Sequence, residues 1–237
     1  MKGIILTGGN ATRWGSVSKI INKHLLPVYD TPQVDFRINK LNEIGISDIG
    51  IILGGPHAEQ VRSYLGEGYT YIWQGEAAGI AQAISLAKNF VGKDKFIVHL
   101  GDQYYESTLV KMRTFPIKDE DIRILLKWDR YANRHGVVTI GAAGKEIKSI
   151  IEKPKYPEEG FVMVGVYGFS PKIFDIIDDL KPSPRGEYEI SDAVWLAIKS
   201  GLKVSVDFLD GIWIDVGTPE NLLKASMVES IIKQKGG

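Results

Sequence analysis

The chain has 237 residues, 44% of them hydrophobic, so it can bury the core of one large α/β domain. Lys plus Arg and Asp plus Glu number 29 each, so no net charge favours nucleic acid or an acidic membrane, and an anion site must be built locally. The chain has no cysteine, which excludes a disulfide framework and a zinc-thiolate site. We expect a cytoplasmic protein that binds neither nucleic acid nor membrane.

The N-terminal segment predicts a buried strand that opens into a glycine-rich loop. An apolar run at residues 3–7 precedes glycines at 8, 9 and 15, and Arg13 and Lys23 add two cations. The Walker motif fails because Ser16 stands where its lysine is required, and the dinucleotide fingerprint fails because Arg13 occupies its third glycine position. Glycines admit a phosphate chain to the backbone and the cations neutralise it, so the pattern favours a phosphate site over a surface turn.

Short apolar runs then alternate with helical patterns as far as about residue 120. Residues 49–53 and 96–100 predict strands, and residues 80–90 predict a helix. Thr31 before Pro32 predicts another helix, with Thr31 as its N-cap. This alternation is typical of βαβ units in a parallel sheet covered on both faces.

The second half of the chain shows a different pattern. Closely spaced strand patterns, which predict antiparallel strands mixed into the sheet, lie at residues 122–128, 136–140, 147–152 and 161–169. Thr218 before Pro219 predicts a last helix that runs to about Lys233. No repeat, low-complexity tract or composition shift marks a linker, so we expect one domain over residues 1–237.

Several motifs taken together resemble one family. In chain order they are Gly8-Gly9-Asn-Ala-Thr12-Arg13, Lys23-His-Leu-Leu-Pro27, Gly79-Ile-Ala-Gln82-Ala, Leu100-Gly101-Asp102, Gly136-Val-Val138, Glu152-Lys153-Pro154, Arg185-Gly-Glu-Tyr-Glu-Ile-Ser-Asp192 and Trp213-Ile-Asp215-Val-Gly217-Thr218. They resemble the motifs of sugar-1-phosphate nucleotidyltransferases, most closely the glucose-1-phosphate thymidylyltransferases. The resemblance implies a single-domain, Rossmann-like α/β fold with a mixed, mainly parallel sheet flanked by helices, the nucleotide-diphospho-sugar transferase fold.

The resemblance also implies a reaction. A sugar-1-phosphate oxygen attacks the α-phosphorus of a nucleoside triphosphate and pyrophosphate leaves, while Mg²⁺ and basic side chains stabilise the charge on the phosphoryl oxygens. Arg13 would lie on the triphosphate, Lys23 at the α-phosphate, and Asp102 and Asp215 would together hold the Mg²⁺. Taken singly, Asp102 could be a strand-end turn residue, and Asp215 could stabilise the start of the helix that follows it.

The resemblance divides the other site residues between the two substrates. The nucleotide half comprises Leu6, Gly8, Gly9, Asn10, Ala11, Thr12, Gln74 and Gly79. The sugar-phosphate half comprises Gly136, Glu152, Lys153, Val164 and Trp213. Gln74 and the backbone N–H of Gly79 would recognise a pyrimidine edge, Lys153 would hold the sugar phosphate, and Glu152 would accept hydrogen bonds from the sugar hydroxyls.

Several of these residues have structural alternatives. Gln82 could touch the nucleotide or stay within its helix, Trp213 could belong to the core, and residues 152–154 could be a solvated strand end. The segment 185–192 would fix a helix start at the pocket wall. Gln103 follows Asp102 where the family often has asparagine. This departure leaves the chemistry intact, but the resemblance does not extend to the details of substrate specificity.

The leading hypothesis is an active thymidylyltransferase that makes a dTDP-hexose from dTTP and glucose-1-phosphate. UTP or another nucleoside triphosphate is the near alternative, since a glutamine and a backbone amide separate pyrimidine from purine more readily than thymine from uracil. A non-catalytic sugar-nucleotide sensor is an alternative of another class, although a sensor does not need the full set of aspartates and cations. The expected partners are the two substrates, and the chain could form a homo-oligomer.

Overall fold

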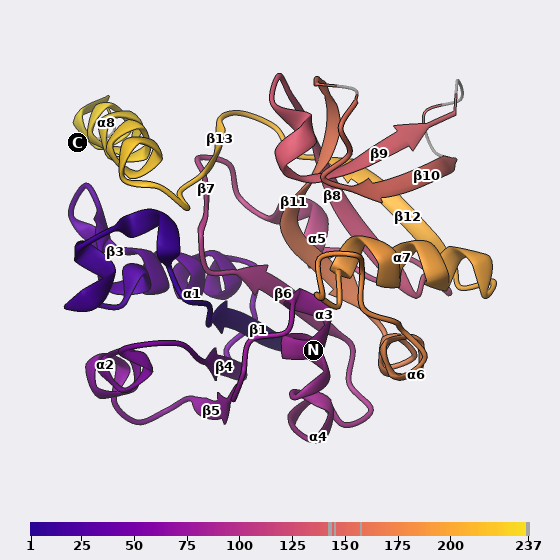
Figure 1. The fold of residues 1–237 in the computed structure, drawn as a ribbon, viewed down its shortest axis with the longest axis horizontal. Coiled ribbons are helices and arrows are strands. Elements are labelled where there is room, and N and C mark those ends of the chain that lie inside the picture. Colours follow the sequence, from indigo (N-terminus) through magenta and orange to yellow (C-terminus); the bar gives the residue numbers. More distant parts are fainter. Residues whose placement is uncertain (142–143, 145, 157, 236–237) are drawn as a thin grey trace.

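The computed structural model describes residues 1–141, 144, 146–156 and 158–235. A nine-stranded sheet runs through it, helices cover the sheet, and there are two small two-stranded sheets (Figure 1). Within the described residues, no helix has the length and apolar character needed to cross a membrane.

The strands are β1 (Lys2–Thr7), β2 (Pro27–Val28), β3 (Thr31–Pro32), β4 (Ile49–Leu53), β5 (Thr70–Trp73), β6 (Phe96–Leu100), β7 (Gln103–Tyr105), β8 (Ile122–Asp129), β9 (Gly136–Ile140), β10 (Ile147–Glu152), β11 (Gly160–Phe169), β12 (Val204–Phe208) and β13 (Trp213–Asp215). The α-helices are α1 (Gln33–Glu43), α2 (Ala58–Leu65), α3 (Ile80–Ser85), α4 (Lys88–Val91), α5 (Val110–Arg113), α6 (Ile173–Asp178), α7 (Ile190–Lys199) and α8 (Pro219–Lys235). Short 3-10 helices are η1 (Thr12–Trp14), η2 (Val17–Lys19), η3 (Lys23–Leu25) and η4 (Ala132–Arg134).

The N-terminal half of the large sheet is parallel, in the order β5-β4-β1-β6. Ile4 and Ile5 of β1 are both fully buried, and they enter hydrophobic clusters on opposite faces of the sheet. Successive side chains of a strand point to opposite faces, so one short apolar run supplies both cores.

Strand β11 joins this parallel half to an antiparallel half. It pairs antiparallel with β6, β8 and β9, and its register shifts between Met163 and Tyr167. β10 extends the sheet beyond β9, and β12 runs parallel to β8. The predicted α/β class with a mixed sheet and flanking helices is therefore confirmed.

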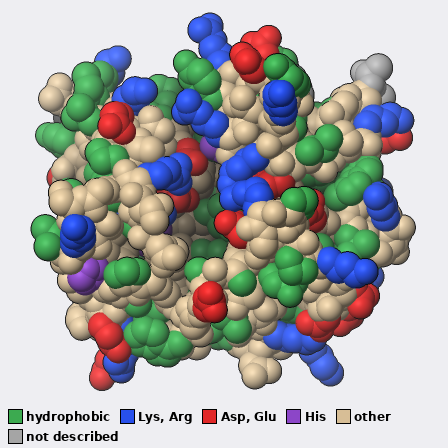
Figure 2. Space-filling model, in the orientation of Figure 1, with side chains coloured by type: hydrophobic (Ala, Val, Ile, Leu, Met, Phe, Trp, Pro, Cys, Tyr) green, Lys and Arg blue, Asp and Glu red, His purple; other side chains and the backbone are tan. Residues whose placement is uncertain are grey.

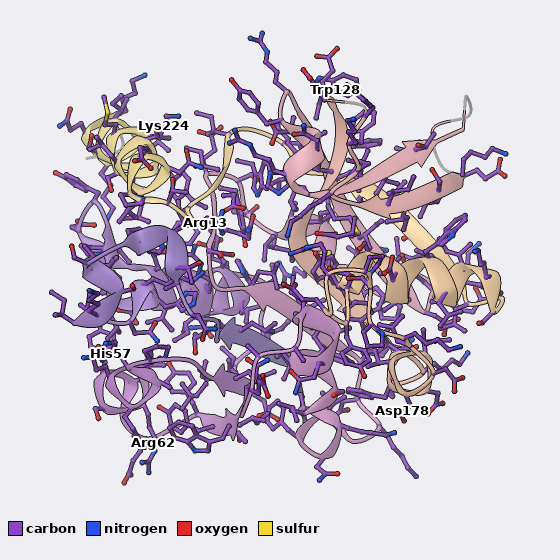
Figure 3. The ribbon with its side chains drawn as sticks, viewed as in Figure 1. Arg13, His57, Arg62, Trp128, Asp178 and Lys224 are labelled. Atoms are coloured by element: carbon purple, nitrogen blue, oxygen red, sulfur yellow. The ribbon has the colours of Figure 1, made fainter. Side chains whose placement is uncertain are left out.

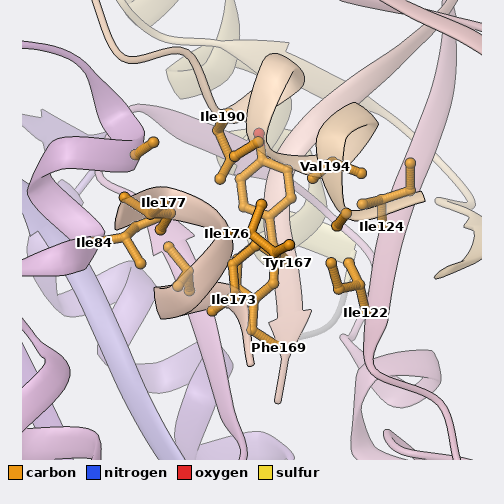
Figure 4. Close-up of a cluster of buried hydrophobic side chains, with 14 of the residues drawn as sticks. Ile84, Ile122, Ile124, Tyr167, Phe169, Ile173, Ile176, Ile177, Ile190 and Val194 are labelled. Carbon is orange, nitrogen blue, oxygen red and sulfur yellow. The ribbon is translucent and has the colours of Figure 1, made fainter. Parts of the chain in front are cut away.

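The larger hydrophobic cluster lies between β11 and the helices α6 and α7. Figure 4 shows Tyr167 and Phe169 of β11 among side chains of both helices, including Ile173 and Ile190. Each such buried side chain stabilises the fold by roughly 1.5–3 kcal/mol relative to an exposed one. This packing fixes α7 against the sheet, beside the C-terminal end of β10.

Two helix predictions differ from the structure. Thr31 is not an N-cap, because Thr31 and Pro32 are extended in β3 and pair with β2, and α1 begins only at Gln33. Residues 80–90 form α3 and α4 instead of one helix. Ala87 N donates to the carbonyl oxygen three residues before it, Ile84 O (3.0 Å), as in a 3-10 turn, and this turn interrupts the α-helical pattern. The last helix begins at Pro219 as predicted.

Candidate active site

Four parallel strands end at one edge of the large sheet, and a cavity lies beyond that edge. These strands are β1, β4, β5 and β6, with β1 between β4 and β6. Open α/β sheets bind ligands outside the carboxyl ends of their strands, where the strand order reverses. The cavity has a volume of about 310 Å³. The face drawn in Figure 2 is hollowed near its centre, and acidic and basic side chains gather around the hollow.

The cavity lining comes from the strand ends, the glycine-rich loop, η3, α3 with the residues just before it, and the segment that precedes α7. The lining residues are Leu6, Gly8, Gly9, Asn10, Lys23, His24, Gln74, Ala77, Gly79, Ile80, Ala83, Leu100, Gly101, Asp102 and Glu187. Ala11 borders a small adjoining hollow, and Thr12 lies on η1. Most of the predicted nucleotide half therefore surrounds one cavity, and Glu187 joins it from a segment predicted only to support a helix start.

The glycine-rich loop lies close to the end of β5. A Cβ on Gly8 would collide with Oε1 of Gln74, so glycine at this position admits the buried Gln74 side chain. Gln74 Nε2 donates to Gln82 Oε1 at 2.8 Å. Gln82 of α3 thus holds the side chain of Gln74 in place at the cavity wall.

Lys23 and Asp102 form an ion pair at the end of β6. Lys23 Nζ donates to Asp102 Oδ2 at 2.8 Å, and both side chains are largely buried. Burial alone would raise the pKa of Asp102, but the charge of Lys23 and its hydrogen bond hold that pKa well below its usual range. Asp102 is therefore a carboxylate at neutral pH, with an ammonium group beside it.

Asp215 lies next to Asp102 through pairing between two short strands. β7 and β13 are antiparallel, so Asp215 is opposite Gln103, and Val216 N donates to the Asp102 carbonyl oxygen at 2.8 Å. Gly217 N donates to Asp215 Oδ1 at 2.8 Å. Burial, and then the charge of Asp102, raise the pKa of Asp215 to about 6. Two carboxylates 113 positions apart in sequence thus share one site.

Arg13 lies close to Asp215. A Cβ on Gly217 would meet both Arg13 Nη2 and, at 2.8 Å, Asp215 Oδ1, which places the guanidinium directly over this turn. Figure 3 shows Arg13 near the centre of the face, whereas His57, Arg62 and Asp178 lie nearer its edges. The structure therefore brings three of the predicted charged residues, Arg13, Lys23 and Asp102, around Asp215.

Two histidines contact this site in ways that the sequence did not predict. His135 Nε2 lies 3.4 Å from Asp129 Oδ2, and its Nδ1 lies 3.9 Å from Asp215 Oδ2. Burial lowers the pKa of His24 to about 3, so its Nδ1–H donates to the Gly101 carbonyl at 2.9 Å and supports the turn into Asp102. No local motif signals the contact of His24 with Gly101 or that of His135 with Asp215, because these partners are far apart in the sequence.

The predicted sugar half is assembled at the joined ends of β9 and β10. Gly136 is paired with Glu152, and Lys153 N donates to the His135 carbonyl at 3.0 Å. Ser191 Oγ, on the first turn of α7, donates to Glu152 Oε2 at 2.9 Å. Lys153 has φ of 40°, a sparsely populated conformation for a residue with a side chain, which is frequent at functional sites. Its Nζ is 3.6 Å from Glu152 Oε1.

The last two predicted residues have different environments. The Val164 side chain is fully buried in a core cluster, so only its backbone is available to a ligand. Trp213 is half-buried, and its ring meets that of His135 edge-on with centroids 5.2 Å apart. Trp213 thus packs against the residue that contacts Asp215.

The described residues contain no group of three or more His, Asp or Glu side chains placed to hold a metal ion. Asp102 and Asp215 offer two carboxylates. Mg²⁺ commonly uses one or two carboxylates and completes its coordination with water and substrate phosphates. The pair therefore fits that cation.

Comparison with known proteins gives one consistent result. A family model described as nucleotidyl transferase matches residues 2–230. The nucleotidyltransferase Agl11 of low-salt glycan biosynthesis in Haloferax volcanii is 34% identical over 100% of this chain and 69% of its own length. A glucose-1-phosphate thymidylyltransferase of Mycolicibacterium smegmatis is 35% identical over 100% of this chain and 85% of its own length. A crystal structure from Bacillus anthracis, assigned as a glucose-1-phosphate thymidylyltransferase in complex with a sucrose, has 38% identity and a TM-score of 0.87 over 96% of this chain and 94% of that one.

Proposed function

The chain belongs to the nucleotidyl transferase family and is an enzyme of the sugar-nucleotidyltransferase type, and we propose that its substrates are dTTP and glucose-1-phosphate. One oxygen of the sugar phosphate attacks the α-phosphorus of dTTP, the bond to the β-phosphate oxygen breaks, and dTDP-glucose and pyrophosphate form. Residues 1–237 act as one nucleotidyltransferase domain in this proposal.

The observation that carries the proposal is the convergence of Lys23, Asp102 and Asp215 at the rim of a cavity beyond the strand ends. A sensor for nucleotide sugars would not need two adjacent carboxylates, one of which is held ionised by a lysine. Phosphoryl transfer does need such an arrangement, because its catalysis rests on positioning and on the stabilisation of phosphoryl charge.

Asp102 and Asp215 would hold Mg²⁺. The raised pKa of Asp215 supports this role, because it reflects a buried carboxylate beside another negative charge, and a divalent cation relieves that repulsion. When bound, Mg²⁺ supplies positive charge to the phosphoryl oxygens of the nucleotide.

The nucleotide occupies the cavity beside β1. The backbone of residues 8–12 approaches the triphosphate, Arg13 stabilises the leaving pyrophosphate, and Lys23 lies at the α-phosphate. Leu6 contacts the sugar and base of the nucleotide. These assignments follow the family pattern, and the placement of most of them around one cavity supports it.

The base lies against Gln74 and Gly79. The Gln74 amide can donate to a carbonyl and accept from the N3–H of thymine or uracil, whereas cytosine lacks that proton. UTP presents the same edge as dTTP, so it remains the second candidate substrate.

The sugar phosphate lies outside this cavity, where the start of β9 is paired with the end of β10. Lys153 pairs with its phosphate and Glu152 accepts hydrogen bonds from its hydroxyls, while Gly136 and Val164 offer backbone groups and Trp213 forms the floor. The hydrogen bond from Ser191 to Glu152 Oε2 fixes the carboxylate at the end of β10, and Glu152 Oε1 lies 3.6 Å from Lys153 Nζ and 3.8 Å from Arg185 Nη1.

The test is pyrophosphate release from each of dTTP, UTP, CTP, ATP and GTP with glucose-1-phosphate, with and without Mg²⁺. We expect turnover with dTTP and UTP that requires Mg²⁺. Faster turnover of ATP or GTP than of dTTP would refute the base assignment, and absence of release with every triphosphate would refute the proposed substrates altogether.

A further inference from the structure

Gln103 uses both ends of its side-chain amide inside the candidate site. The indole Nε1–H of Trp213 donates to Gln103 Oε1 at 2.8 Å, and Gln103 Nε2 donates to Asp102 Oδ1 at 3.2 Å. The glutamine therefore links Trp213 to the carboxylate of Asp102.

The chemistry of the indole group fixes the direction of this link. An indole N–H can only donate, so the amide oxygen of Gln103 must face Trp213 and the amide NH₂ must face Asp102. Gln103 is only 4% exposed, so bulk water does not compete for either end. A carboxylate side chain at this position could accept from Trp213 but could not donate to Asp102.

The surrounding backbone is shaped to admit this side chain. Gly165 has φ of 75°, and a Cβ there would lie 2.8 Å from Gln103 Cγ and 3.1 Å from its Cδ. Gln103 is also opposite Asp215 in the pairing of β7 with β13. The side chain is thus confined by β11 on one side and anchored by β13 on the other.

We propose that Gln103 is a positioning residue that holds the Asp102 carboxylate in the orientation required for metal binding, and that it takes its own orientation from Trp213. Asp102 Oδ2 is fixed by Lys23 and Oδ1 by Gln103, so rotation of the carboxylate is opposed at both oxygens. The inference deepens the proposed function and rests on it, because the proposed function places Trp213 at the floor of the sugar site. Contacts at the sugar floor are thereby linked to the metal carboxylate.

The test measures Mn²⁺ binding to the free protein by electron paramagnetic resonance, together with the indole resonance of Trp213 by ¹⁵N NMR. Gln103→Met keeps the volume but removes both hydrogen bonds, and we expect about 10-fold weaker Mn²⁺ binding, the lower end of the effect seen for groups that orient metal ligands. The Trp213 indole resonance should shift in the same variant. A second variant, Trp213→Phe, removes the indole donor. Its matched control is Trp195→Phe, because Trp195 is on α7 outside the site, and this control should bind Mn²⁺ as the wild type does.

The double variant separates positioning from independent effects. Trp213→Phe removes the donor that orients the amide, so it should weaken Mn²⁺ binding in the wild-type background but have no further effect in the Gln103→Met background. Additive losses, or wild-type affinity in Gln103→Met, would overturn the inference. If Gln103→Met does not fold, Trp213→Phe decides alone, and unchanged Mn²⁺ affinity then counts against the proposal.

The inference and the proposed function fail in different ways. If the wild type binds Mn²⁺ and the variants behave as expected, but dTTP and glucose-1-phosphate yield no pyrophosphate, the substrate assignment is wrong and the positioning role stands. If the wild type binds no Mn²⁺, the positioning role is overturned.

Discussion

Replacement of Asp215 by asparagine should make the metal-free protein more stable. The folded state keeps a buried carboxylate at this position beside the charge of Asp102, and the pKa of Asp215 rises from its usual 3.8 to about 6 as a result. Asparagine removes the charge but keeps an oxygen that can accept the hydrogen bond from Gly217 N.

The magnitude follows from the pKa. At about 1.4 kcal/mol per pKa unit, a rise from 3.8 to about 6 costs the folded state up to about 3 kcal/mol. The folded pKa of Asp215 lies above the unfolded one, so this cost is complete above pH 6 and is relieved as the pH falls towards 4. Asp215→Asn should therefore gain up to about 3 kcal/mol at pH 8, roughly half of that at pH 5, and little at pH 4.

Urea unfolding followed by tryptophan fluorescence, in the presence of a chelator, measures this difference at the three pH values. Asp179→Asn, at an exposed aspartate, is the control and should unfold as the wild type does at each pH. Equal or lower stability of Asp215→Asn at pH 8, or a gain that does not change with pH, would refute the reasoning. The same variant should lose the Mg²⁺-dependent activity, so stability and function would change in opposite directions.

Three further substitutions test the metal and substrate assignments. Asp102→Ala should lower turnover by several orders of magnitude without unfolding the protein, as kinetics and circular dichroism would measure; near-normal turnover at limiting Mg²⁺ would contradict the metal role. Lys153→Ala should weaken the apparent affinity for the sugar-1-phosphate by about 10- to 100-fold, because it removes a charge-assisted pair, and should affect the triphosphate far less. Equal losses for both substrates would mean that the subsites are misassigned. Gln74→Ala should bring the rates with UTP and CTP closer together while the Mg²⁺ requirement persists, and an unchanged ratio would exclude Gln74 from base recognition.

The strands were predictable from the sequence because their signals are local. The runs at residues 49–53 and 96–100 match β4 and β6, and the patterns that predict β9 and β10 match their bounds. Each run is apolar or alternating over five or six residues and is bounded by turn residues, and such local patterns are enough to predict a strand.

The helix breaks and site contacts were not predictable in the same way. Thr31 carries a helix-start signal, but its pairing with Val28 in β2 outweighs that signal. The contacts of His135 with Asp129 and Asp215 join the residue after η4 to the ends of β8 and β13, and no spacing rule relates them. The adjacency of Asp102 and Asp215 was available only from the resemblance to a family, because it depends on the pairing of β7 with β13.

The position of β11 bears on how substrates enter and leave. This strand is hydrogen-bonded to β6, whose end leads to Asp102, and to β9, whose start is Gly136 (Figure 1). A hinge that separated β6 from β9 would have to break part of this ladder, at about 1 kcal/mol for each backbone hydrogen bond. The sheet therefore keeps the end of β6 and the start of β9 at a constant spacing. Motion that admits a ligand would then have to come from segments outside the sheet, such as the glycine-rich loop, whose residues 8–10 line the cavity.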